Sequence, residues 1–136
     1  MSDTTTHETL TDQEYRRLLR AANKLDYRYG FTVYALEHTG MRTGELAHFR
    51  PDWFDAESKL ITIPDSQDGW QPKSRQERSI SLDGASTETI RWYLSTLGEN
   101  AYEWSPRTIH RHVTVAAEEA GLDSVTPYDL RYKFFR

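Results

Sequence analysis

Three cationic residues stand at separate points of the chain and could together bind an anion: Arg42, Lys73 and Arg131. An arginine guanidinium forms forked hydrogen bonds with a phosphate or carboxylate, whereas a lysine ammonium is a mobile point charge. Arg42 taken alone is better explained as a surface residue in a turn between helices. A shared anion site becomes the better interpretation only because the other two cations follow at a distance.

The turn around Arg42 is suited to holding this side chain at a fixed angle. Arg42 lies in residues 39–46 (TGMRTGEL), directly after a largely apolar run. Gly40 can end a helix because glycine adopts the left-handed cap conformation at little cost. Thr43 can cap the next helix by accepting a hydrogen bond from a backbone N–H. We therefore expect Arg42 in a tight break between two helices.

The composition indicates one soluble, globular domain. The chain has 136 residues, of which 37% are hydrophobic and 28% are charged, enough for a real core in a single domain. It contains no cysteine, which excludes disulfides and thiolate metal sites. The polar N-terminus is not a signal peptide, and no apolar run is long enough to cross a membrane. We expect a cytoplasmic protein without a membrane partner.

The net charge of −4 argues mildly against a nucleic-acid partner, because such proteins usually carry a basic surface. The charge is uneven, however. Residues 1–14 contain four acidic side chains and no Lys or Arg, whereas residues 128–136 contain three basic side chains and one acidic one. A binding site depends on the local charge, so nucleic acid stays open as a partner.

Apolar residues at helical spacing, with capping residues at their starts, predict six helices. We expect them at about 12–24, 27–38, 44–49, 86–97, 106–120 and from 127 to the end of the chain. Residues 1–9 are predicted to be a disordered lead-in, and 98–104 a loop. The helix at 27–38 is apolar on most sides, which is typical of a buried central helix.

Between the third and fourth helices the pattern changes to that of short strands. Strands are expected at 60–63, 70–73 and 78–82, where β-branched or alternating residues occur between turn residues. Lys73 then lies close to the tip of a hairpin. The predicted fold class is α+β, mostly helical with a small three-stranded antiparallel sheet.

The helix at 106–120 carries Arg107, His110 and Arg111 on its solvent side. Such charges usually belong to a solvated helix face. They indicate a nucleic-acid-binding surface only if another feature of the sequence independently points to nucleic acid. His110 and His112 lie on different faces of the helix, so a zinc pair is not expected. No glycine-rich phosphate loop is present.

Three segments, in this order and setting, resemble the catalytic domain of tyrosine recombinases, the phage integrase family. Residues 39–46 (TGMRTGEL) are similar to the family's first box, and residues 71–82 (QPKSRQERSISL) to its lysine hairpin. Residues 126–132 (TPYDLRY) resemble its second box, commonly T-P-H-x-L-R-H. The likeness covers residues 10–136, with some features of archaeal members. It implies a mostly helical, integrase-like fold.

The resemblance implies a reaction on double-stranded DNA that needs no cofactor and no metal. In the family, a tyrosine hydroxyl attacks a phosphodiester and forms a phosphotyrosyl bond. Arg42 and Arg131 match the arginines that bind the non-bridging oxygens, and Lys73 matches the group that protonates the leaving 5′ oxygen. Glu45 matches a carboxylate that orients an arginine. Its position also suits an ordinary acid in the first turn of a helix.

Because the resemblance implies DNA as the partner, four further basic side chains are expected to contact it. These residues are Arg75, Arg107, His110 and Arg111.

Two features depart from the family pattern. Tyr128 stands where the family usually has histidine, and a phenol can donate a hydrogen bond to phosphate but is a poor base at neutral pH. The later box and the nucleophilic tyrosine have no counterpart before Arg136, so the sequence is interpreted as a C-terminally truncated catalytic domain. We expect DNA recombination with the tyrosine supplied elsewhere, for example by another recombinase subunit. The alternative is a non-catalytic DNA- or recombinase-binding regulator, or a degenerate remnant.

Overall fold

The structure, a computed structural model, describes residues 10–98 and 104–136. The lead-in predicted for residues 1–9, and most of the loop predicted for 98–104, lie outside the described residues. Within the described residues, no helix combines the length and apolar character needed to span a bilayer.

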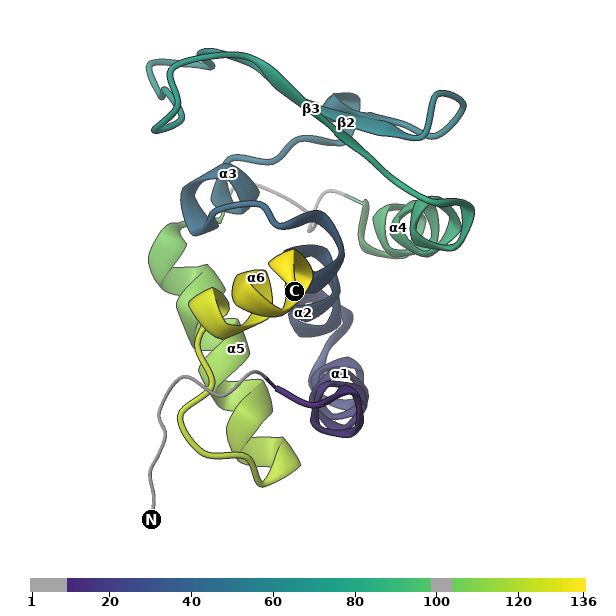
Figure 1. Cartoon of the computed structure of the whole chain (residues 1–136), viewed down its shortest axis with the longest axis vertical. Coiled ribbons are helices and arrows are strands. Elements are labelled where there is room, and N and C mark those ends of the chain that lie inside the picture. Colours follow the sequence, from purple (N-terminus) through teal and green to yellow (C-terminus); the bar gives the residue numbers. More distant parts are fainter. Residues whose placement is uncertain (1–9, 99–103) are drawn as a thin grey trace.

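Six α-helices build most of the described structure (Figure 1). Their bounds are α1 Asp12–Leu25, α2 Tyr27–Thr39, α3 Thr43–Ala47, α4 Gly84–Leu97, α5 Pro106–Ala120 and α6 Pro127–Phe135; a short 3₁₀ helix, η1, covers Pro51–Trp53. All six predicted helices are confirmed, each within about two residues of its expected ends.

The helix starts follow from the capping residues in the sequence. Thr11 and Glu14 form a reciprocal capping box at α1. The side chain of Ser105 accepts a hydrogen bond at the start of α5, directly before Pro106, where a missing N–H costs nothing. Thr126 caps α6 in the same way, and the side chain of Asp129 accepts in return from the Thr126 backbone.

Helix α2 is the centre of the molecule, as its apolar sequence predicts. It packs against each of the other five helices, and Phe31, Val33 and Leu36 are at most 1% exposed. Figure 1 shows α6 lying across α2, with α4 on the side toward the sheet, α1 on the opposite side, and α5 running alongside from the level of α3. Because α2 ends at the Arg42 turn, this packing fixes where the turn lies in the fold.

The sheet is three-stranded and antiparallel, as predicted, but one strand was predicted in the wrong place. Its strands are β1 Phe54–Asp55, β2 Leu60–Ile63 and β3 Arg78–Ser81, in the order β1-β2-β3, with Ile61 opposite Ile80. Residues 70–73 do not form a strand.

The physical reason for this error is local. Pro72 has no backbone N–H to donate to a ladder, and the whole stretch 64–77 forms a long connection between β2 and β3. The third strand is instead the two-residue segment Phe54–Asp55, which pairs with β2. Such a short strand carries no periodic signal, so the sequence pattern could not reveal it.

A buried histidine in this core gives the fold a predicted pH dependence. His112 is 6% exposed, its Nδ1 lies 2.7 Å from the Thr32 hydroxyl, and its ring stacks on Tyr29 with centroids 4.5 Å apart. Burial, with the Arg28 cation as a further cause, lowers the pKa of His112 from 6.5 to about 4. The neutral ring is therefore the form that the folded protein accommodates.

Since the folded pKa lies below the unfolded one, the unfolded chain binds the proton first. His112 then contributes stability that is complete above about pH 6.5 and is lost as the pH falls toward about 4. We expect it to account for a loss of about 2–3 kcal/mol between pH 7 and pH 4.5. Urea unfolding at both pH values should show this loss in the parent protein and a smaller one in His112→Gln. An NMR titration with a His112 midpoint above pH 6 would contradict the prediction.

Candidate functional site

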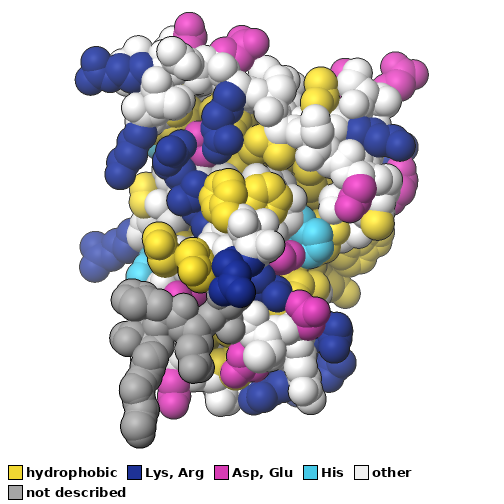
Figure 2. Space-filling view, in the orientation of Figure 1, with side chains coloured by type: hydrophobic (Ala, Val, Ile, Leu, Met, Phe, Trp, Pro, Cys, Tyr) yellow, Lys and Arg dark blue, Asp and Glu magenta, His cyan; other side chains and the backbone are white. Residues whose placement is uncertain are grey.

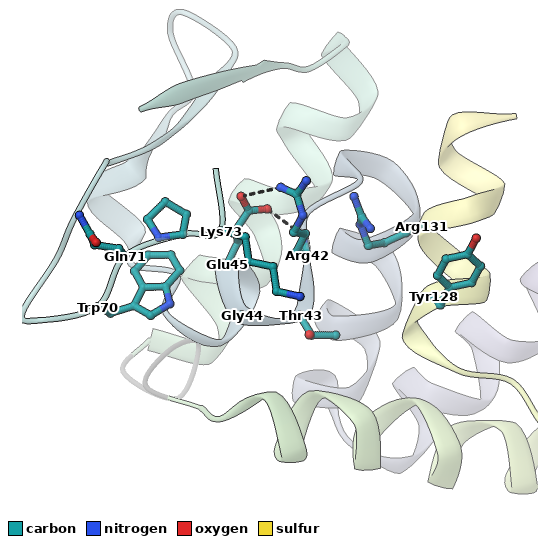
Figure 3. A pocket seen from close by; sticks show the side chains of 10 residues that line it. Arg42, Thr43, Gly44, Glu45, Trp70, Gln71, Lys73, Tyr128 and Arg131 are labelled. Atoms are coloured by element: carbon teal, nitrogen blue, oxygen red, sulfur yellow. Dashed lines mark hydrogen bonds and ion pairs between the residues drawn. The ribbon is translucent and has the colours of Figure 1, made fainter. Parts of the chain in front are cut away.

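All three predicted cations, Arg42, Lys73 and Arg131, line one hollow of about 340 Å³, which we call the arginine pocket. It is lined by Arg42, Thr43, Gly44, Glu45, Trp70, Gln71, Pro72, Lys73, Tyr128 and Arg131. Figure 3 shows α6 contributing residues from one side and the β2–β3 connection from the other, with α3 between them. Three segments far apart in the sequence therefore meet at one site.

The turn before α3 holds Arg42 as the sequence predicts, with one difference. Gly40 ends α2 in the left-handed conformation, with φ of 71°. The capping residue of α3 is Arg42 itself, whereas Thr43, predicted to be the cap, is the first helical residue. The backbone N–H of Arg42 donates to the Glu45 carboxylate over 2.8 Å, so the turn is tied to the first turn of α3 by Glu45 and not by the threonine hydroxyl that we expected.

Glu45 is the buried centre of a charge cluster. It is 1% exposed and accepts two hydrogen bonds from the Arg78 guanidinium, at 3.2 Å from Nε and 2.7 Å from Nη2. The guanidinium of Arg42 lies 3.6 Å from the same carboxylate. This carboxylate therefore fixes both the backbone and the side chain of Arg42, and it also joins β3 to α3.

Arg131 reaches the pocket from α6 and is anchored on the Arg42 turn. Its Nε donates to the carbonyl oxygen of Gly40 over 2.8 Å, and its guanidinium lies over the Phe135 ring at 5.3 Å. Burial, followed by the nearby positive charge of Arg42, lowers the pKa of Arg131. The two guanidiniums are thus held close enough to repel one another, and a bound anion would relieve that repulsion.

Lys73 and Tyr128 complete the pocket from opposite sides (Figure 3). Lys73 is exposed and lies in a turn of the β2–β3 connection, whereas the strand predicted over 70–73, which would have placed it near a hairpin tip, does not form. Tyr128 is 63% exposed on the first turn of α6. Its ring stacks on that of Tyr132, with centroids 6.1 Å apart. Both polar groups are therefore accessible to a ligand.

The remaining predicted DNA-binding residues lie outside the pocket. Arg75 is exposed two residues after Lys73, and Arg107, His110 and Arg111 are exposed on α5. Figure 2 shows Lys and Arg side chains gathered at the upper left of the view, over α3 and the β2–β3 connection. No group of three or more metal-ligating side chains occurs among residues 10–98 and 104–136.

Sequence reasoning missed three residues of this site: Arg78, Trp70 and Gln71. Trp70 and Gln71 line the pocket, whereas Arg78 binds Glu45 from the start of β3. Arg78 could have been found, because it is two residues before the buried Ile80 and side chains at this spacing share one face of a strand. Gln71 begins the segment that resembles the lysine hairpin but was assigned no role, and nothing in the sequence indicated Trp70.

Comparison with known proteins places these features in a family. Residues 8–136 match the phage integrase family, which is nearly the whole chain. The chain belongs to the phage integrase family. The tyrosine recombinase XerA of Pyrococcus furiosus is 25% identical over 139 aligned residues, which cover 93% of this chain and 46% of that protein. The resemblance predicted from the three sequence boxes is thus confirmed.

Solved structures of the family share the fold. A crystal structure of XerA recombinase matches with a TM-score of 0.77 at 22% identity, over 98% of this chain and 50% of that one. The Tn1549 transposon integrase, in complex with a circular intermediate DNA, matches with a TM-score of 0.70 at 18% identity, over 98% and 53%. This integrase-family chain therefore spans about half the length of the relatives that it matches.

Proposed function

We propose that this chain forms the phosphate-binding part of a tyrosine recombinase site that breaks and rejoins double-stranded DNA. The observation that carries the proposal is the meeting of Arg42, Lys73 and Arg131 around one pocket. These residues come from three separate segments, and each matches a catalytic position of the family.

In this mechanism the two guanidiniums hold the non-bridging oxygens of the scissile phosphate. A tyrosine hydroxyl attacks the phosphorus and passes its proton to solvent water, and the bond from phosphorus to the 5′ oxygen breaks. The ammonium of Lys73 gives its proton to that leaving oxygen. The negative charge that develops is stabilised by Arg42 and Arg131, whose positions are fixed in advance by Glu45 and by the Gly40 carbonyl.

Tyr128 has a narrower role in this proposal. Its exposed phenol borders the pocket and donates a hydrogen bond to a phosphate oxygen in place of the family's usual histidine. The attacking tyrosine is a different residue, because Tyr128 and Tyr132 both fall within the segment that resembles the second box. We place the nucleophile outside these 136 residues, either in a longer polypeptide or in another recombinase subunit.

DNA is the partner that the charge distribution favours. The exposed cations Arg75, Arg107 and Arg111 extend the positive surface beyond the pocket. The structural neighbour from the Tn1549 transposon was solved with DNA, and about half of that chain shares the fold of this one. Contacts from these outer residues would neutralise flanking phosphates and orient the duplex.

The first test is binding to a mixed-sequence DNA duplex, measured by fluorescence anisotropy at several salt concentrations. Arg42→Gln and Arg131→Gln should each weaken binding about 10–100-fold, the loss expected for a charge-assisted contact of about 1.5–3 kcal/mol. Each should also reduce the salt dependence by about one phosphate contact. Arg91→Gln, an exposed α4 residue paired with Glu88, is the matched control and should bind as the parent does.

The second test asks whether the pocket supports chemistry. The chain is mixed with a relative that retains its tyrosine but has lost its own catalytic arginines, and DNA cleavage is scored as a covalent protein–DNA product. Rescue that disappears with Lys73→Gln would support the recombinase role. DNA binding without any rescue would favour the alternative of a non-catalytic DNA- or recombinase-binding regulator.

A further inference from the structure

The segment that carries Lys73 has little regular backbone pairing of its own. Residues 64–77 connect β2 to β3, and most of their side chains are exposed. Two backbone hydrogen bonds between Gln67 and Trp70, of 2.8 and 2.9 Å, close a tight turn. Both central residues of this turn have positive φ, as in type I′ hairpin turns. The position of Lys73 therefore depends on how this turn is attached to the rest of the protein.

Four side chains attach this turn through ring stacking and hydrogen bonds, and we call them the Trp70 cluster: His48, Trp53, Gln67 and Trp70. An exposed ion pair between Arg50 and Asp68 also joins the turn to the segment after α3. The indole of Trp70 stacks on the His48 ring with centroids 4.3 Å apart and planes 9° apart. The Gln67 amide donates to the His48 carbonyl over 2.9 Å and accepts from the Trp53 indole N–H over 2.9 Å. The turn is thus joined to the segment that directly follows α3.

This cluster is connected to the arginine pocket in two ways, through His48 and through Trp70. His48 caps the C-terminal end of α3, and its Nδ1 bonds to the Gly44 carbonyl over 2.8 Å. Gly44 and Trp70 both line the pocket. Trp70 precedes Lys73 by three residues, a span of at most about 10 Å of chain. Fixing Trp70 against α3 therefore limits how far the backbone of Lys73 can move from the pocket.

We propose that the Trp70 cluster is the positioning element of Lys73, and that Trp70 and His48 are positioning residues for proton delivery in the pocket. The chemical meaning of this inference rests on the proposed function, because only there does Lys73 donate a proton. The placement of the β2–β3 connection can be tested independently of the proposed function. Trp70 is only half-buried, so its loss should loosen the β2–β3 connection while the helical core stays folded.

The test uses the absence of cysteine from the chain. Lys73→Cys and Glu118→Cys, the second an exposed residue on α5, allow two spin labels to be attached at defined positions. Double electron–electron resonance then gives the distribution of distances between the labels. Trp70→Ala and His48→Ala should each broaden this distribution at least twofold. Trp70→Phe and His48→Phe keep an aromatic stack and should restore the narrow distribution.

The matched control is Trp92→Ala, which removes an exposed tryptophan from α4 and should leave the distribution unchanged. Thermal unfolding verifies that each variant is folded, and His48→Ala decides the matter if Trp70→Ala does not fold. An unchanged width in a folded stack-deficient variant would overturn the inference, whether or not the chain binds DNA. If the distance distribution broadens but the parent chain does not bind DNA, the positioning element is supported and the proposed function is rejected.

Discussion

Replacing Glu45 by alanine should lower the free energy of unfolding by about 3 kcal/mol. The carboxylate is 1% exposed and accepts hydrogen bonds from the Arg78 guanidinium and the Arg42 backbone. Its removal leaves two cations facing one another without a counter-charge, and breaking a buried pair typically costs about 3–5 kcal/mol. We take the lower end, because the side chains of Arg42 and Arg78 are 42% and 34% exposed and partly hydrated.

Urea unfolding measures this effect, and two variants calibrate it. Glu45→Gln keeps an oxygen that can accept from the Arg42 backbone, so it should lose only about half as much stability. Glu88→Gln removes a carboxylate from an exposed ion pair on α4 and should change stability by less than about 0.5 kcal/mol. A loss below about 1 kcal/mol in Glu45→Ala would show that the cluster does not hold the Arg42 turn.

Replacing Gly40 by alanine is expected to have the second large effect, a loss of about 2–4 kcal/mol. Gly40 has φ of 71°, a conformation that costs an L-residue about 1–2 kcal/mol. A side chain at this position would also collide with the Phe134 ring of α6, and overpacking against this 38% exposed ring adds about 1–2 kcal/mol. Since the Gly40 carbonyl binds Arg131, the same substitution should displace that guanidinium and weaken DNA binding.

The steric and conformational parts can be separated by mutation. Phe134→Ala in the Gly40→Ala background should recover the steric part alone, as a favourable coupling of about 1–2 kcal/mol in a double-mutant cycle. Gly44→Ala is the matched control, because nothing lies within 4 Å of an added Cβ and the position does not have a positive φ. It should be neutral or slightly stabilising. Equal losses at the two glycines would refute the role assigned to Gly40.

The helices were predictable because their signals are local. Capping boxes at Thr11 and Thr126, and the Ser105–Pro106 start, fix helix beginnings through hydrogen bonds within a few residues. The sequence of α2 likewise predicted a central position, since the helix is apolar on most of its sides. These features depend only on residues close in the sequence, so tertiary packing did not shift the helix starts.

The β2–β3 connection was predicted less well, because its order comes from distant contacts. Residues 70–73 resembled a strand in composition but lie in a turn-rich segment held by His48 and Trp53. The strand that does complete the sheet, Phe54–Asp55, is defined by its partner β2 and not by its own pattern. Strand pairing depends on a register between two segments, which a single segment does not encode.

By itself, the sequence determined the family and the fold class: two arginines and a lysine lie in three family-like segments, on a mostly helical framework. Only the tertiary structure decided how these groups are held. The pairing of Glu45 with Arg78, the anchoring of Arg131 on the Gly40 carbonyl, and the stack of Trp70 on His48 all join residues from separate segments. Residue types and helix caps are determined by short stretches of sequence, whereas contacts between distant side chains depend on how the whole core packs.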